Sequence, residues 1–444
     1  MSKLCFYCKS PAWACRIKPT LNTTRRNHLL ALCQRAKIIG LTAFILGLPI
    51  SIAAMQAALV LFGLAYVVEA ALTKSFRFPA TPINRPLFTY IAVTIVVSFF
   101  SLSFLKNVNE FRSICVKIAA FYLVTLFLQE RAQVKRCVKL LLLGVSVAAV
   151  YGVMQYYLEV ELLRPGKPLI LLRHVENDSN LPVRINGFNS YMTFSEQLAM
   201  TLLILLALWF AVKTTSQRAI LSIVGLLIFF ALLWTYTRSA WVGAACGLLL
   251  FGYLRARKFV IVLLPLLALG LLNPDLQDRL FSIFQAEENL ERLYTWESTL
   301  RIIRDHPLVG IGKGGNFSKV IGAYRESRYP GFDFTSRAHA HNNILQVTAE
   351  GGVLSLLSFL WLWAVMFHAL YRAYRQIPAT QPLFEWLALG CLCAIVAFFV
   401  QGFFEHNWSD AESVTMMWFI LALALKLPSL QECKDSSLRS EMQK

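Results

Sequence analysis

The chain has 444 residues, of which 57% are hydrophobic and only 15% charged, and its formal net charge is +18. A soluble domain carries roughly 25% charged residues, whereas the mean hydropathy of this chain is +0.55. The composition therefore excludes an ordinary soluble globular protein. It predicts an all-α polytopic membrane protein.

Apolar stretches long enough to cross about 30 Å of hydrocarbon recur along the chain. We expect about 12 transmembrane helices, at residues 38–52, 53–72, 87–105, 114–129, 138–158, 194–212, 219–236, 239–254, 259–273, 344–370, 385–404 and 412–427. The first apolar stretch begins only after a polar, basic segment, so the pattern predicts no cleavable signal peptide.

Lysines and arginines predict the orientation, because short loops rich in these residues stay in the cytoplasm. Arg131 to Lys139 and Arg255 to Lys258 are two such basic turns. We therefore expect both termini in the cytoplasm. Contact with anionic membrane lipids accounts for the net charge, and no nucleic-acid partner is expected. The predicted order is a cytoplasmic tail (1–37), helices 1–9 (38–273) with a smaller outside loop (159–193), a large outside loop (274–343), helices 10–12 (344–427) and a cytoplasmic tail (428–444).

The large outside segment contains a predicted helix of its own. Between Glu287 and Arg304, apolar residues recur at helical spacing. Pro307 and Gly310 end the pattern. We therefore expect a large helical loop outside the membrane, and loops held on a rigid scaffold commonly carry functional sites.

Other motifs have simpler interpretations. The ten cysteines avoid both large outside loops, so no disulfide framework is expected. Cys5 and Cys8 have a zinc-like spacing, but no second pair completes a site nearby. Gly310 to Gly315 fits G-x-G-x-x-G without a preceding strand, which favours a flexible turn over a phosphate nest. Glu405-His406-Asn407 is interpreted as a local helix cap or as the lining of a cavity.

Three residues remain as candidates for chemistry. Arg238 lies between two apolar stretches, where an unpaired charge is costly and either an anionic ligand or lipid phosphate would stabilise it. Arg292 lies on the predicted loop helix. His341 lies just before an apolar helix, and a neutral imidazole suits proton abstraction near pH 7. Arginine forks hold a diphosphate well, so two arginines and one base indicate transfer from a diphosphate to a sugar hydroxyl.

These motifs resemble the O-antigen ligase and polymerase superfamily of bacterial envelope enzymes. The resemblance covers roughly 184–352 most strongly. Its carriers are Thr237-Arg238-Ser239-Ala240-Trp241, Glu291-Arg292-Leu293-Tyr294-Thr295-Trp296, Asp305-His306-Pro307-Leu308-Val309-Gly310-Ile311-Gly312 and His339-Ala340-His341-Asn342-Asn343 followed by Glu350-Gly351-Gly352.

The resemblance implies a GT-C-like membrane glycosyltransferase of the bacterial inner membrane, inverting and independent of metal and cofactor, with its active site facing the periplasm. The donor would be a glycan on undecaprenyl diphosphate and the acceptor a sugar of the lipid A core. By analogy His341 would be the general base, with Arg238 and Arg292 holding the diphosphate. The substrate-binding residues would be Arg184, His339, Asn342, Trp296 and Glu350.

One observation on the residues agrees with metal independence. The first outside turn, near Pro49 to Gln56, has no carboxylate with which to bind a divalent cation, so arginine is left to offset the diphosphate charge. The acceptor is less well defined. An O-antigen or exopolysaccharide polymerase and a protein O-oligosaccharyltransferase stay open as alternatives, and a transporter of lipid-linked sugars is a more distant one.

Overall fold

The computed structural model describes residues 23–100, 104–164, 169–171, 183–255, 272–285, 289–313, 316–334 and 339–430. This part of the chain is helical apart from one short antiparallel pair, β1 (Ile170–Leu171) with β2 (Val183–Arg184). The prediction of an all-α polytopic protein is confirmed at this level.

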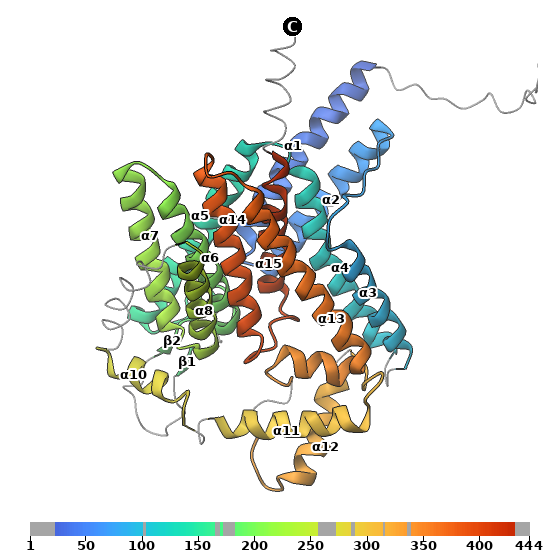
Figure 1. Cartoon of the computed structure of the whole chain (residues 1–444), viewed down its shortest axis with the longest axis vertical. Coiled ribbons are helices and arrows are strands. Elements are labelled where there is room, and N and C mark those ends of the chain that lie inside the picture. The colour runs from blue at the N-terminus through green and yellow to red at the C-terminus, as the bar shows by residue number, and fades with distance from the viewer. Residues whose placement is uncertain are drawn as a thin grey trace, which may run out of the picture.

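Most helices form one elongated bundle (Figure 1). Its members are α1 (Thr23–Gly47), α2 (Ile52–Thr73), α3 (Asn84–Phe99), α4 (Phe104–Phe127), α5 (Arg131–Leu158), α6 (Tyr191–Ala211), α7 (Thr215–Trp234), α8 (Arg238–Leu254), α13 (Asn343–Gln376), α14 (Pro382–Gln401) and α15 (Ala411–Lys426). Helix α1 begins well before the apolar stretch that starts at residue 38, because helical hydrogen bonds do not require apolar side chains.

Seven helices of the described residues are long and apolar enough to cross a membrane, namely α1, α2, α5, α6, α7, α13 and α14. Helices α3 and α8 are apolar but shorter. The chain is therefore a multi-pass membrane protein. The total of about 12 spans stays a prediction, and most of the ninth predicted span, 259–273, lies outside the described residues.

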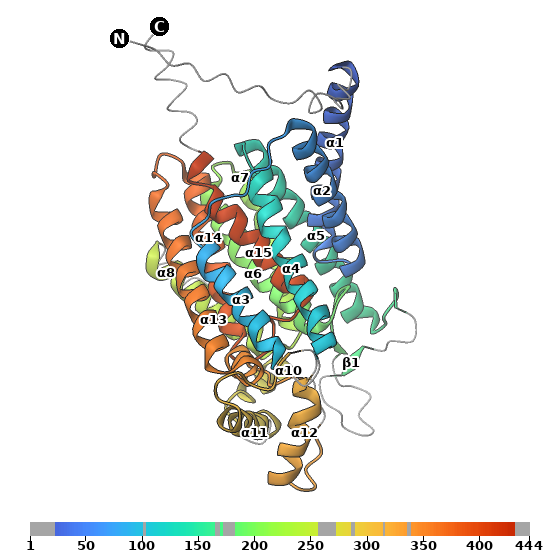
Figure 2. The ribbon, with the colours of Figure 1, turned by 90° about the vertical axis from the view of Figure 1, so that its right-hand side faces the viewer.

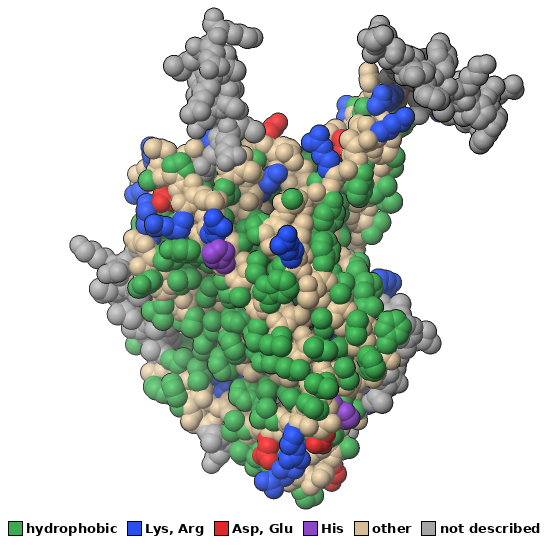
Figure 3. Space-filling model, turned by 45° about the vertical axis from the view of Figure 1, so that its right-hand side comes forward, with side chains coloured by type: hydrophobic (Ala, Val, Ile, Leu, Met, Phe, Trp, Pro, Cys, Tyr) green, Lys and Arg blue, Asp and Glu red, His purple; other side chains and the backbone are tan. Residues whose placement is uncertain are grey.

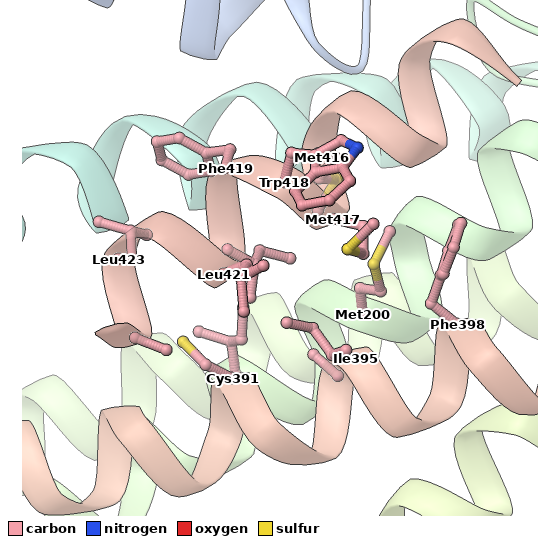
Figure 4. Close-up of a cluster of buried hydrophobic side chains, with 14 of the residues drawn as sticks. Met200, Cys391, Ile395, Phe398, Met416, Met417, Trp418, Phe419, Leu421 and Leu423 are labelled. Carbon is pink, nitrogen blue, oxygen red and sulfur yellow. The ribbon is translucent and has the colours of Figure 1, made fainter. Parts of the chain in front are cut away.

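Helices α6, α14 and α15 form the centre of the bundle. In the most apolar parts of α6 and α14, 78% and 72% of the residues are buried. Figure 4 shows Met200 of α6 near Ile395 and Phe398 of α14 and near Met417 in a row of side chains from α15. Because this centre is shielded from lipid on all sides, it forms the rigid part of the scaffold.

Helices α8 and α14 approach each other closely through glycine. A methyl group added to Gly243 would lie 2.6 Å from the carbonyl oxygen of Ala397. Small residues of this kind allow backbones to pack at short range inside a membrane. The first residue of α8 is Arg238, so this contact also fixes where the arginine emerges from the bundle.

The outside of the bundle is apolar and faces the membrane. Helices α2 and α7 expose large hydrophobic side chains, including Leu64 at 60% and Ile223 at 68%. Figure 3 shows hydrophobic side chains as a broad band on one face, with Lys and Arg gathered toward one end and mixed charges at the other. A hydrocarbon environment explains the band, since such a surface would be unstable in water.

Three shorter helices form a cap at one end of the bundle (Figures 1 and 2). They are α10 (Pro274–Phe281), α11 (Leu290–Asp305) and α12 (Asn316–Arg328). The cap has its own small core, which includes Ile302, Phe317 and Ile321. Helix α11 occupies the predicted helical segment and ends before Pro307, because proline cannot continue the hydrogen-bonding pattern.

The close contact of α8 with α14 predicts a specific instability. Gly243→Ala places a methyl group against backbone and should destabilise the protein by about 1–3 kcal/mol, a typical cost of overpacking. Gly322→Ala is the matched control, since nothing lies within 4 Å of its added methyl group. Thermal unfolding in detergent should show a lower midpoint for the first variant only. Equal unfolding midpoints for the two variants would show that α8 and α14 move apart to accommodate the methyl group without loss of stability.

Candidate active site

The segment from His339 to Asn342 immediately precedes α13 and is held from both sides. The side-chain oxygen of Asn342 caps α13 by accepting from the Leu345 N–H at 3.0 Å. The Trp296 indole N–H, from α11, donates to the Ala340 carbonyl at 2.9 Å. The segment is therefore fixed at the junction of bundle and cap.

The backbone of His341 has an unusual conformation. Its φ angle is +49°, in the left-handed region that side chains other than glycine rarely adopt. Tyr236 has the same φ angle, two residues before Arg238. The other two such residues in the described part of the chain, Lys74 and Glu159, cap the ends of helices. His341 and Tyr236 instead lie in the turns just before α13 and α8, and strained backbone of this kind clusters at functional sites.

The imidazole of His341 is paired with a buried carboxylate. Its Nδ1 lies 2.9 Å from Oε1 of Glu405, which belongs to the connector between α14 and α15. Glu405 is only 4% exposed. Its other oxygen, Oε2, lies 3.6 Å from the Arg292 guanidinium. The Glu405 carboxylate therefore interacts with both His341 and Arg292, which lie on separate parts of the outside segment.

Glu405 is ionised in this environment. Burial acts to raise the pKa of the Glu405 carboxyl, but the hydrogen bond from His341 and the interactions with His339 and Arg292 outweigh it and lower the pKa to about 2. An ionised carboxylate only accepts hydrogen bonds, so Nδ1 of His341 carries the hydrogen. Nε2 is then the basic nitrogen of the ring.

His339 lies beside this pair. Its Nδ1 accepts the backbone N–H of His341 at 3.3 Å and lies 3.8 Å from Oε1 of Glu405. Burial, together with the neighbouring His341, lowers the pKa of His339 to about 4. This imidazole is therefore neutral at pH 7 and adds no positive charge to the site.

The connector that carries Glu405 is attached to the start of α13 by two asparagines. Asn343 donates its backbone N–H to the Gly402 carbonyl at 2.7 Å and its side-chain N–H to Asn407 at 2.7 Å. Its side-chain oxygen accepts from the His406 ring at 3.1 Å. Asn342 donates to the Phe403 carbonyl at 3.0 Å. These bonds position the carboxylate against His341.

Arg238 and Arg292 are connected through the start of α11. The guanidinium of Arg238 donates to the Ser282 carbonyl at 2.7 Å and to the Asn289 side chain at 3.0 Å. Asn289 directly precedes α11, and Arg292 lies in the first turn of that helix. The two arginines thus meet the same end of α11, one from the bundle and one from the cap.

The side chain of Arg184 is buried and bonds other parts of the protein. It is 8% exposed, stacks on the Tyr191 ring at 3.6 Å and donates to the carbonyls of Thr235 and Tyr236 at 3.1 and 3.2 Å. Burial lowers its pKa to about 10, so the guanidinium stays charged at pH 7. It holds the strained turn from which Arg238 emerges.

Glu350 is also connected to the histidine segment through an intermediate. Gln346 donates to Glu350 at 2.8 Å and accepts from the Ala340 N–H at 2.7 Å. Just beyond, α13 kinks at Gly352, where φ is +63°. The N–H groups of Ile311 and Gly312 bond the carbonyls of Ala349 and Glu350 at the kink. The glycine-rich segment, interpreted from sequence as a flexible turn, therefore supplies backbone partners for a broken helix.

The residue that sequence reasoning missed is Glu405. It was interpreted as part of a helix cap or cavity lining, whereas the structure places it against His341 and Arg292. The available signal was an acidic residue beside two polar ones after the apolar stretch 385–404. A carboxylate at that position is costly unless it has partners.

Three groups of the site have the chemistry of metal ligands. His339, His341 and Glu405 each offer one atom, and these atoms lie within 4.8 Å of one another. Two imidazoles and one carboxylate are a common zinc ligand set. The Arg292 guanidinium beside Glu405 opposes a resident cation, since like charges repel in a buried site.

The fold and the site define a multi-pass membrane protein with a strained polar centre where a helical cap meets the bundle. Residues 223–360 match a family model described as O-antigen ligase. The chain is similar to the O-antigen ligase of Salmonella typhimurium, 26% identical over 230 residues, which are 49% of this chain and 56% of that protein. It is also similar to a Rickettsia conorii protein that carries the name polysaccharide ligase, 24% identical over 173 residues, which are 37% of this chain and 38% of that protein.

The resemblance to the O-antigen ligase family that the sequence motifs indicated is therefore confirmed. The chain spans little more than half of the first relative's length and less of the second. The family model includes Arg238, Arg292 and His341 and ends before Glu405.

The hydrogen bonds that Asn343 makes to the connector predict that this residue stabilises the fold as well as the position of Glu405. Asn343→Ala leaves three partners without their hydrogen bonds, on Asn407, His406 and Trp408, and two of these bonds are buried. An unsatisfied buried polar group costs about 1–3 kcal/mol, so thermal unfolding should shift to a clearly lower midpoint.

Asn342→Ser is the comparison variant for this measurement. Serine keeps a helix-capping oxygen and loses only one exposed hydrogen bond, to Phe403. Its midpoint should stay close to that of the unmodified protein. Equal losses in the two variants would contradict the role of Asn343 as the main attachment of the connector.

Proposed function

We propose that the protein is an O-antigen ligase, which transfers a glycan from undecaprenyl diphosphate to a sugar of the lipid A core. The observation that carries the proposal is the His341–Glu405 pair with Arg292 beside it. The names of the two relatives support ligase over polymerase. Reaction at the anomeric carbon would proceed with inversion, in one displacement.

His341 is the proposed general base. Its Nε2 takes the proton of the acceptor hydroxyl as the oxygen attacks the anomeric carbon. Glu405 holds the Nδ1–H, which fixes the tautomer, and stabilises the imidazolium that forms. The bond from the anomeric carbon to the diphosphate oxygen breaks, and undecaprenyl diphosphate leaves with the electron pair.

Arg292 and Arg238 are the proposed diphosphate-binding groups. Arg292 is 26% exposed, and its 3.6 Å separation from Glu405 is longer than a hydrogen bond, so its fork is available to an incoming anion. Arg238 lies at the other side of the same helix end, on hydrogen bonds to Ser282 and Asn289. Two fixed guanidinium charges stabilise the leaving diphosphate, so the proposed mechanism uses no metal cofactor.

The remaining predicted site residues take positioning roles in this proposal. Trp296 and Asn342 fix the histidine segment, and Glu350 acts on it through Gln346. Arg184 holds the turn before Arg238. His339 borders the reacting imidazole and keeps its surroundings neutral.

We place the site on the periplasmic face of the bacterial inner membrane. Lysine and arginine side chains gather toward the end of the bundle opposite the cap (Figure 3), and basic loops stay in the cytoplasm. The cap and the site then face the periplasm, beside the outer leaflet that presents both the lipid-linked donor and the lipid A core. Both termini would be cytoplasmic.

Removing the base or its partner should have similar consequences. His341→Ala should lower transfer by about 10²–10⁴-fold, the usual contribution of a general base. Glu405→Gln should lower it by a comparable factor, because the amide N–H donates to Nδ1 and moves the ring hydrogen to Nε2. Glu326→Gln, an exposed carboxylate on α12, is the control and should transfer normally.

The assay uses purified protein with a lipid-diphosphate-linked glycan and lipid A core in the presence of chelator. It follows both glycosylation of the core and the chain length of the donor. A glycosylated core that depends on His341 and Glu405 supports the ligase. Lengthened donor with an untouched core would mean a polymerase, and turnover of neither would favour a protein acceptor or transport.

Diphosphate binding by a guanidinium fork gives a separate prediction. Arg292→Lys keeps the charge but loses the planar pair of donors, so transfer should fall at least about tenfold in kcat/KM. Arg301→Lys lies on the same helix and pairs with Glu297 away from the site, so it serves as the control. If the two variants transferred equally well, bidentate recognition by Arg292 would be wrong.

A further inference from the structure

The atoms of His339, His341 and Glu405 form a triangle that fits a transition-metal ion. Oε1 of Glu405 lies 2.9 Å from Nδ1 of His341 and 3.8 Å from Nδ1 of His339. Two ligands bound to zinc at 2.0–2.1 Å in tetrahedral geometry lie about 3.3 Å apart. The two separations from Oε1 lie on either side of this value, and all three ligand atoms lie within 4.8 Å of one another, so side-chain rotations can bring them to zinc-binding distances.

Hydrogen bonds already hold the three ligand atoms close together. The backbone N–H of His341 donates to Nδ1 of His339, so this nitrogen is the unprotonated one of its ring. The carboxylate oxygen of Glu405 accepts from Nδ1 of His341. A metal ion would replace the hydrogen on Nδ1 of His341 and displace the 3.3 Å hydrogen bond to Nδ1 of His339, which frees the lone pairs of all three atoms for the ion.

We propose that this triangle is a reversible Zn²⁺ site and that occupancy by Zn²⁺ inhibits the protein. The ligands are Nδ1 of His339, Nδ1 of His341 and Oε1 of Glu405, and a water molecule or substrate oxygen completes the tetrahedron. Inhibition rests on the proposed function, in which His341 is the base. Binding of the ion itself does not depend on the proposed function.

Metal binding and base catalysis require opposite tautomers of His341. A neutral imidazole has one ring hydrogen. In the pair with Glu405 that hydrogen is on Nδ1 and the lone pair of Nε2 accepts a proton. When Nδ1 binds Zn²⁺, the hydrogen moves to Nε2, which then has no lone pair to offer. The ion also takes the carboxylate oxygen that would stabilise the imidazolium.

Arg292 makes the site weak enough to be reversible. Its guanidinium lies 3.6 Å from Oε2 of Glu405, on the far side of the same carboxylate. A divalent cation bound to Oε1 would experience this positive charge at close range in a site with little solvent. The repulsion lowers the affinity, so the ion binds reversibly.

The ligand set also predicts selectivity. Two imidazole nitrogens and one carboxylate suit Zn²⁺ and its transition-metal neighbours. Mg²⁺ and Ca²⁺ prefer sites made wholly of oxygen ligands. Zn²⁺ should bind and inhibit at concentrations at which Mg²⁺ does neither.

The test measures Zn²⁺ binding by calorimetry and inhibition of transfer on the full chain in lipid nanodiscs. Cys5 and Cys8 offer thiolates of their own, so every protein carries Cys5→Ser and Cys8→Ser. His339→Ala should weaken Zn²⁺ binding at least about tenfold, because a ligand is lost. His306→Gln, an exposed histidine at the end of α11, is the matched control and should bind as before.

Arg292→Gln supplies the opposite change. It removes the opposing charge while keeping all three ligands, so Zn²⁺ binding should tighten by about tenfold or more. General damage to the site would weaken binding in this variant as well as in His339→Ala. Opposite shifts in the two variants therefore support the proposed ligands and the effect of the arginine.

Two results would overturn the proposal. One is Zn²⁺ binding that His339→Ala leaves unchanged, and the other is bound Zn²⁺ with undiminished transfer. Absence of any transfer together with ligand-dependent binding would separate the two proposals, since the metal site would stand while the proposed function and its inhibition would fail.

Discussion

The buried carboxylate of Glu405 is the group on which the arrangement of the site depends. An ionised group that is 4% exposed costs several kcal/mol in lost hydration unless partners replace the water. Here the partners come from separate parts of the chain, since His341 precedes α13 and Arg292 lies on α11. Glu405 follows α14, so its charge brings together the end of α14, the start of α13 and, at 3.6 Å, the first turn of α11 in the cap.

The strain at the site follows from the same requirement. His341 points its ring at Glu405 only because its backbone adopts a positive φ angle, and the Asn342 cap and the Trp296 hydrogen bond hold it there. A comparable turn at Tyr236 starts α8 with Arg238 directed toward Ser282 and Asn289. Buried Arg184 stabilises that turn. Hydrogen bonds to backbone carbonyls thus offset strained conformations on both sides of the site.

Features encoded locally could be predicted from the sequence, and those that depend on long-range contacts could not. Hydropathy predicts the membrane helices because their length is set by the bilayer, and the spacing before Pro307 predicts α11. His341 was singled out by its position before an apolar helix. Glu405 was not, because its partner lies 64 residues away and nothing in Glu405-His406-Asn407 specifies which segment it meets. Arg184 resembled a substrate-binding residue, but its burial against Tyr191 depends on tertiary packing.

The two arginines and the histidine pair impose opposite demands on the same small volume. In the proposed mechanism, diphosphate binding requires fixed positive charge close to Glu405, and proton abstraction requires that Nε2 of His341 keep its lone pair. Glu405 meets both requirements, because one of its oxygens attracts Arg292 while the other accepts the Nδ1–H of His341.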